Sequence, residues 1–249
     1  GDRVYRAWMN KDIMLFIIGE KPMECGMNIL GAHIDSPRID IKQNPLYEDE
    51  HLAYLDTHYY GGIKKYQWVA LPLALHGVVV KKDGTTVTLN IGDKPGDPVF
   101  YISDLLIHLA ADQMGKTAAK VIEGDSLNII IGSEPKKDTD KDPVKTAILD
   151  ILKEQYSIDE EDFISAELEA VPAGHARDLG FDRSMIMGYG HDDRVCAYPS
   201  MAAVLNYEGT PEYTLAAVLT DKEEIGSVGA TGMGAMYFEN TMAELIACV

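Results

Sequence analysis

The sequence has 249 residues, of which 22 are basic and 40 acidic, so its formal net charge is −18. With no cluster of lysine or arginine, this balance argues against nucleic acid as a partner, because phosphate binding depends on clustered positive charge. No apolar run approaches the roughly 18 residues that a membrane-spanning helix needs, so no membrane association is expected. Cys25, Cys196 and Cys248 are far apart. We therefore expect neither a disulfide framework nor a thiolate zinc site, and a reducing, cytoplasmic location is the default.

The first informative stretch is Asn28 to Pro37, which is expected to be a strand that runs into a turn. His33 and Asp35 are two positions apart, so they lie on the same face of that strand. A metal-bound histidine usually donates its other ring N–H to a carboxylate or carbonyl. The alternative is a strand-end histidine that is hydrogen-bonded to an acidic neighbour without a metal.

From about residue 51 the pattern becomes β-rich. A turn at 82–85 followed by alternation over 86–91 predicts a hairpin. Residues 103–114 have apolar side chains at helical spacing, and 143–156 predict a helix with Pro143 in its first turn. Strands are also expected at 126–132, 167–171 and 184–189, and a mixed-charge loop at 134–142. Antiparallel signals of this kind favour a β-rich module inserted into another domain.

Two adjacent aspartates, Asp192 and Asp193, open a helical pattern that runs from Arg194 to Tyr207. Acidic residues in the first turn of a helix are favoured by the helix dipole and by capping, which is one explanation for the pair. The other is that one aspartate bridges two metal ions, because a carboxylate can span the roughly 3.5–4 Å between the ions of a two-metal site.

Two adjacent glutamates, Glu223 and Glu224, follow an apolar run over 213–219 that predicts a buried strand. In open α/β sheets, catalytic groups collect beyond the carboxyl ends of the strands. Neighbouring residues of an extended segment point to opposite sides. One glutamate can therefore bind a metal while the other acts as general base. A solvated acidic turn is the alternative.

Four segments, taken in order, resemble the M18 aspartyl aminopeptidase family, a group of two-metal exopeptidases related to the M42 glutamyl aminopeptidases. These segments are Gly31–Pro37, Thr57–Ile63, His191–Arg194 and Asp221–Ser227. The resemblance implies an α/β fold, with a three-layer α/β/α catalytic domain formed by residues 1–50 and 166–249. An inserted β-rich oligomerisation domain, residues 51–165, would interrupt it.

The resemblance also implies the roles of five residues. His33 would bind one metal ion, and Asp35 would orient its ring. Asp192 would bridge the two ions, and Glu224 would be a terminal ligand of the other ion. Glu223 would be the general base.

Three further residues are candidates for supporting roles. Asp193 would support the loop beside Asp192. In some members of the family a histidine from a neighbouring subunit reaches the active site, and His108 is in roughly the corresponding region. An acidic substrate residue would need a nearby cation, for which Lys64 is a candidate.

The cofactors implied are two divalent metal ions per subunit, zinc first, with cobalt or manganese as alternatives. The implied substrates are short peptides, with acidic N-terminal residues as the best-known class, and the implied assembly is a homo-oligomer such as a dodecamer.

The family pattern has five metal ligands, of which this sequence carries three. We therefore expect either that the natural polypeptide continues past Val249 or that this copy does not bind two metal ions. Two other functions stay open: a non-catalytic or truncated oligomeric scaffold with a vacant metal site, and a hydrolase of the same architecture acting on a non-peptide amide.

Overall fold

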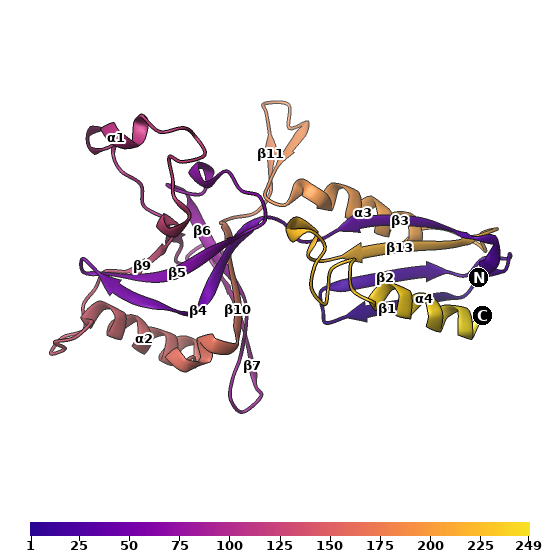
Figure 1. Cartoon of the computed structure of the whole chain (residues 1–249), viewed down its shortest axis with the longest axis horizontal. Helices are drawn as coiled ribbons and strands as arrows, with labels where there is room; N and C mark the ends of the chain where they lie inside the picture. Colours follow the sequence, from indigo (N-terminus) through magenta and orange to yellow (C-terminus); the bar gives the residue numbers. More distant parts are fainter. The chain divides into compact units, whose positions relative to one another are not determined.

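The computed structural model describes residues 1–249, which mix strands and helices and divide into two compact units (Figure 1). Unit 1 comprises residues 1–37 and 190–249, and unit 2 comprises residues 38–189. The boundaries predicted at 50/51 and 165/166 differ from these, because β4 (Arg38–Asp49) and β10 (Ala166–Pro172) pair with strands of unit 2. No helix has both the length and the apolar character needed to cross a bilayer.

Unit 1 is built on a four-stranded sheet with the strand order β1-β2-β13-β3. The strands are β1 (Arg3–Trp8), β2 (Asp12–Ile17), β13 (Thr214–Thr220) and β3 (Met27–His33). The pairs β1–β2 and β2–β13 are antiparallel, whereas β13 and β3 are parallel. The strands predicted before His33 and before Glu223 are therefore confirmed, and they are neighbours in the sheet.

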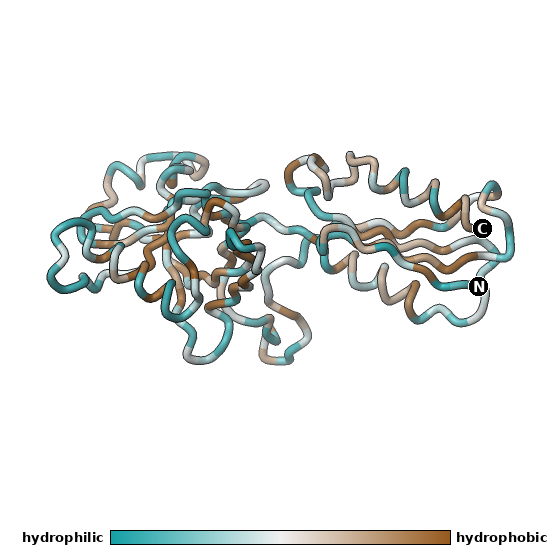
Figure 2. Tube along the Cα trace, turned by 90° about the horizontal axis from the view of Figure 1, so that it is seen from below, coloured by the Kyte–Doolittle hydropathy of each residue, from teal (hydrophilic) through white to brown (hydrophobic).

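Alternate residues of a strand point to opposite sides. Both faces of this sheet carry apolar side chains, and a helix covers each face. On one face, Met14, Phe16 and Val218 form an apolar cluster with residues of α4 (Tyr237–Cys248). On the other, Ile17 and Ala217 pack with Val204 of α3 (His191–Leu205). Figure 2 shows the largely apolar strands of this unit between the two helices.

The parallel pair β3–β13 is in register to its last residues. Thr220 is opposite His33, and the Ile34 N–H donates to the Thr220 carbonyl oxygen at 2.9 Å. The segments that follow these strands therefore leave the sheet at the same edge.

Unit 2 contains a seven-stranded sheet with the strand order β10-β4-β5-β9-β8-β6-β7. Strand β10 also pairs with β6, so the sheet closes on itself. The remaining strands are β5 (Leu52–Tyr60), β6 (Pro72–Val80), β7 (Thr86–Ile91), β8 (Phe100–Tyr101) and β9 (Ile129–Gly132). Its core includes the fully buried side chains of Ile39, Leu73, Val79, Leu127 and Ile158, and α2 (Pro143–Tyr156) packs beside it. A separate hairpin is formed by β11 (Arg177–Leu179) and β12 (Met185–Met187).

The predicted hairpin at 82–91 and the predicted helix at 143–156 are confirmed by β6–β7 and by α2. The helix predicted over 103–114 is wrong. That segment contains only a 3₁₀ turn (Ile107–Leu109) and the four-residue helix α1 (Ala111–Met114). Leu106 and Leu109 are 56% and 67% exposed. Without a surface to bury its apolar stripe, a short helix gains too little to form.

Gly77 of β6 is a position where the fold requires glycine. Its φ is +136°, and a Cβ there would lie 2.0 Å from the Glu167 carbonyl oxygen of β10. We expect Gly77→Ala to destabilise the protein by about 3 kcal/mol, because the backbones of β6 and β10 would have to separate. Urea denaturation measures this, with Gly62→Ala as control, since a Cβ at Gly62 meets nothing within 4 Å. Equal effects of the two substitutions would contradict the expectation.

Candidate functional site

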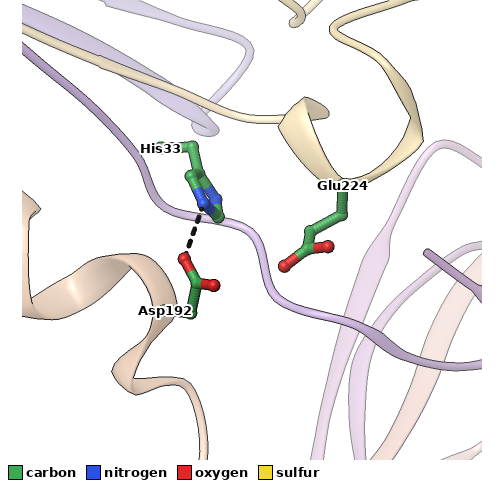
Figure 3. Close-up of side chains that lie close together, drawn as sticks. All are labelled: His33, Asp192 and Glu224. Carbon is green, nitrogen blue, oxygen red and sulfur yellow. Dashed lines mark hydrogen bonds and ion pairs between the residues drawn. The ribbon is translucent and has the colours of Figure 1, made fainter. Parts of the chain in front are cut away.

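The ends of β3 and β13 and the start of α3 bring three side chains of unit 1 together (Figure 3). His33 is the last residue of β3, and Glu224 lies in the 3₁₀ turn η6 (Glu223–Ile225) that follows β13. Asp192 lies at the start of α3, where its φ and ψ are −84° and 111°, so the regular helix begins after it. Three predicted metal ligands, remote in sequence, therefore lie side by side.

The donor atoms of His33, Asp192 and Glu224 all lie within 4.8 Å of one another. His33 Nε2 is 3.2 Å from Asp192 Oδ1. One imidazole nitrogen and two carboxylates are a ligand set that zinc accepts, with bonds of about 2.0–2.2 Å. The three side chains therefore fit a divalent cation in both chemistry and spacing.

Asp35 lies behind this cluster, and its side chain is fully buried. Its Oδ1 accepts a hydrogen bond from His33 Nδ1 at 3.0 Å. The same oxygen accepts from the Glu223 N–H at 3.2 Å, and Oδ2 accepts from the Glu224 N–H at 3.2 Å. One carboxylate thus keeps a proton on Nδ1, so that Nε2 is the ring nitrogen that faces Asp192 and could bind a metal, and it also holds the backbone of both glutamates.

Burial, hydrogen bonds and charge within the cluster change two pKa values. Burial disfavours protonated His33, but hydrogen bonds and charge from Asp35 and Asp192 outweigh it and raise the pKa of the ring. Burial, together with the charges of Asp192, Asp35 and Glu223, raises the pKa of Glu224, although His33 opposes this shift. The site therefore concentrates negative charge that a bound cation would neutralise.

Glu223 lies on the open side of the cluster. Its side chain is 56% exposed, and Oε2 is 3.9 Å from His33 Nε2. Its carboxylate is therefore accessible to solvent and lies beside the proposed ligands, as a general base would.

The chain also matches a known protein family. The family model described as "Aminopeptidase I zinc metalloprotease (M18)" matches residues 1–249. The chain belongs to the M18 family. A curated relative, "Probable M18 family aminopeptidase 1" of Clostridium acetobutylicum, is 60% identical over 99% of the chain and 53% of its own length.

Solved structures of M18 proteins share the fold. The crystal structure of an M18 aminopeptidase from Thermotoga maritima is 45% identical and superposes with a TM-score of 0.94, covering 100% of this chain and 55% of its own. A dodecamer of mApe1 from S. cerevisiae is 18% identical, with a TM-score of 0.71, and covers 98% of this chain and 54% of its own. The chain thus spans about half the length of the M18 relatives that it matches.

The other predicted site residues are not in the cluster of donor atoms. Asp193 is half-buried and hydrogen-bonds with Cys196, which raises the pKa of that thiol. His108 and Lys64 belong to unit 2, where both are exposed. Their roles stay predictions.

Buried groups that no sequence pattern indicates lie beneath the cluster of His33, Asp192 and Glu224. Asp12, at the start of β2, is 3% exposed, and its Oδ1 accepts a hydrogen bond from the Asp221 N–H at 2.8 Å. Asp221 is 7% exposed and accepts a hydrogen bond from the Thr231 hydroxyl at 2.9 Å. Ser36 donates to the Asp192 carbonyl oxygen at 2.9 Å. No local pattern distinguishes such residues, because their partners are remote in sequence.

Burial raises the pKa of Asp12 from 3.8 to about 6, and the charges of Asp221 and Asp35 add to this, while the Asp221 N–H and Lys11 oppose it. The folded protein therefore binds more protons than the unfolded chain between about pH 4 and pH 6. Its stability falls as the pH rises through this window, by up to about 3 kcal/mol. We expect Asp12→Asn to remove most of this fall, as measured by urea denaturation of metal-free protein at pH 4.5 and 7.5. The same fall in both proteins would assign it to other groups.

Proposed function

We propose that the protein containing this chain is a metal-dependent aminopeptidase that removes N-terminal residues from short peptides. The observation that carries the proposal is the convergence of His33, Asp192 and Glu224 within 4.8 Å, beside the accessible carboxylate of Glu223. Membership of the M18 family supports the same activity.

In the proposed mechanism, a bound divalent ion would lower the pKa of the attacking water and polarise the substrate carbonyl. Glu223 accepts a proton from that water while the water oxygen attacks the carbonyl carbon of the first peptide bond. When the C–N bond breaks, Glu223 returns the proton to the leaving amine. Asp35 keeps His33 in the tautomer that leaves Nε2 unprotonated, and it holds Glu223 and Glu224 through their N–H groups.

The proposal includes two ions per subunit, zinc in preference to cobalt or manganese, and Asp192 would be a ligand shared by both. The side chain of Asp192 is 85% exposed. An exposed carboxylate at this position has room to bind a second ion through its other oxygen. The zinc assignment is supported by the description of the M18 family model.

The proposed architecture is a three-layer α/β/α catalytic domain around the sheet of unit 1, with unit 2 as an inserted oligomerisation domain. Five large apolar side chains on one segment of unit 2 are 54–67% exposed, and they are those of Leu105, Leu106, Ile107, Leu109 and Met114. Such a patch favours burial against another subunit. A homo-oligomer, with the dodecamer of yeast mApe1 as one example, would cover it and would place His108 at a subunit contact.

Substrate preference is proposed for acidic N-terminal residues, Asp or Glu. A cationic side chain would have to bind such a residue, and the sequence offers Lys64 as the candidate. A panel of N-terminal aminoacyl substrates tests this: Lys64→Ala should raise the KM for acidic substrates and leave that for leucyl substrates unchanged.

Metal dependence tests the proposed function itself. Chelation of the full-length protein should abolish hydrolysis of aminoacyl peptides, and addition of zinc should restore it. A folded protein that binds no metal would favour the oligomeric scaffold instead. Hydrolysis of non-peptide amides with no action on peptides would favour the amidase.

A further inference from the structure

The turn that carries Glu223 and Glu224 is anchored where it leaves the sheet. Strand β13 ends at Thr220, and the next residue, Asp221, donates its N–H to Asp12 Oδ1 at 2.8 Å. Both Asp12 and Asp221 are buried, so this hydrogen bond is shielded from water. It lies at the point where the chain departs from the sheet.

The register of the sheet explains why Asp12 is in this place. Strands β2 and β13 are antiparallel, with Leu219 opposite Ile13. Asp12, the first residue of β2, therefore lies beside the end of β13. Its side-chain carboxylate accepts the N–H that follows the last residue of the strand, and so extends the hydrogen bonding between the two strands by one step.

A second buried contact holds Asp221 through its side chain. Thr231 is 4% exposed, and its hydroxyl donates to Asp221 Oδ2 at 2.9 Å. Asp221 is therefore held at its backbone by β2 and at its carboxylate by the chain that returns after the turn.

The turn between these anchors is compact. The Ser227 N–H donates to the Lys222 carbonyl oxygen at 2.8 Å, and the Gly226 N–H donates to that of Glu223 at 2.8 Å. On its other side, Asp35 accepts the N–H groups of Glu223 and Glu224. Two buried carboxylates, Asp12 and Asp35, thus hold the turn from two directions.

The buried Asp12 carboxylate lowers the stability of the fold more than an ordinary residue at a strand end would. Its Oδ2 atom is buried and has no hydrogen-bond partner. A buried carboxylate oxygen without a partner destabilises a protein. Natural proteins tolerate such unfavourable groups at functional sites and compensate for them elsewhere.

We propose that Asp12 is a positioning residue that places Glu223 and Glu224 for metal binding and catalysis by holding the Asp221 N–H. The expected effect on metal binding rests on the proposed function. The expected effect on the position of the turn rests on the hydrogen bond between Asp12 and the Asp221 N–H.

Two pairs of substitutions in the full-length protein test it. Asp12→Ala removes the acceptor, whereas Asp12→Asn keeps a carbonyl oxygen at the same place. Thr231→Val removes the second anchor, and Thr241→Val is its control, because the buried Thr241 hydroxyl bonds the Tyr237 carbonyl oxygen within α4. Zinc affinity is measured by competition with a chromophoric chelator. Amide hydrogen exchange over residues 221–227 is measured in the metal-free protein.

Asp12→Ala should weaken zinc binding by about 10-fold and speed exchange over 221–227, and Thr231→Val should act in the same direction. Asp12→Asn and Thr241→Val should match the unmodified protein in both measurements. Unchanged zinc affinity and exchange in folded Asp12→Ala would overturn the proposal, as would an equal loss in Asp12→Asn. If Asp12→Ala does not fold, the comparison of Thr231→Val with Thr241→Val decides. Failure of the proposed function would be seen separately, because the unmodified protein would then neither bind zinc nor hydrolyse peptides. In that case the hydrogen-exchange data would still test whether Asp12 holds the turn at residues 221–227.

Discussion

Replacement of Glu223 by glutamine is expected to lower kcat for peptide hydrolysis by about 10²–10⁴-fold, the usual contribution of a general base. Glutamine has the same size but cannot accept the proton of the attacking water. The backbone N–H of residue 223 would still donate to Asp35, so the turn should keep its shape. Glu223 is outside the set of donor atoms within 4.8 Å, so the metal should remain bound.

Metal analysis and steady-state kinetics of the same preparation check this result. Glu239→Gln is a suitable control, because Glu239 is an exposed glutamate of α4 in the same unit. A loss of both metal and activity in Glu223→Gln would identify Glu223 as a ligand instead of a base. Full activity with the metal retained would mean that another group takes the proton.

The sequence predicts the parts of the fold that depend on local patterns. Helix α2 spans the predicted residues 143–156, because Pro143 suits the first turn and its apolar residues recur at helical spacing. Strand β13 differs by one residue at each end from the predicted 213–219. The same spacing rule fails at 103–114, where Leu105, Leu106 and Leu109 are all more than half exposed. Periodicity indicates which residues could share a face, but burial decides whether the helix forms.

The candidate site was predictable as three separate acidic or histidine-containing segments. Local patterns indicate the segments, and the resemblance to M18 proteins implies that His33, Asp192 and Glu224 are the residues that bind metal. Their convergence depends on the parallel pairing of β3 with β13, which no short segment determines. Asp12 could not be found in this way. Its partner Asp221 is 209 positions away, and only the antiparallel register of β2 and β13 brings them together.

Asp35→Asn is the second substitution with a large expected effect, because three donors converge on this buried side chain. Asparagine has one carbonyl oxygen, so its NH₂ group would face either the Glu224 N–H or the two donors at Oδ1. We expect zinc affinity to fall by about 10–100-fold and stability by about 1–3 kcal/mol. Chelator competition and urea denaturation measure the two effects. Asp12→Asn is the matched control, since it also replaces a buried aspartate of unit 1 but leaves its single donor satisfied. If both variants bound zinc equally well, the buried Asp35 charge would be dispensable, and the orientation of His33 would have to come from the hydrogen bond between Nδ1 and the Asp35 carbonyl oxygen.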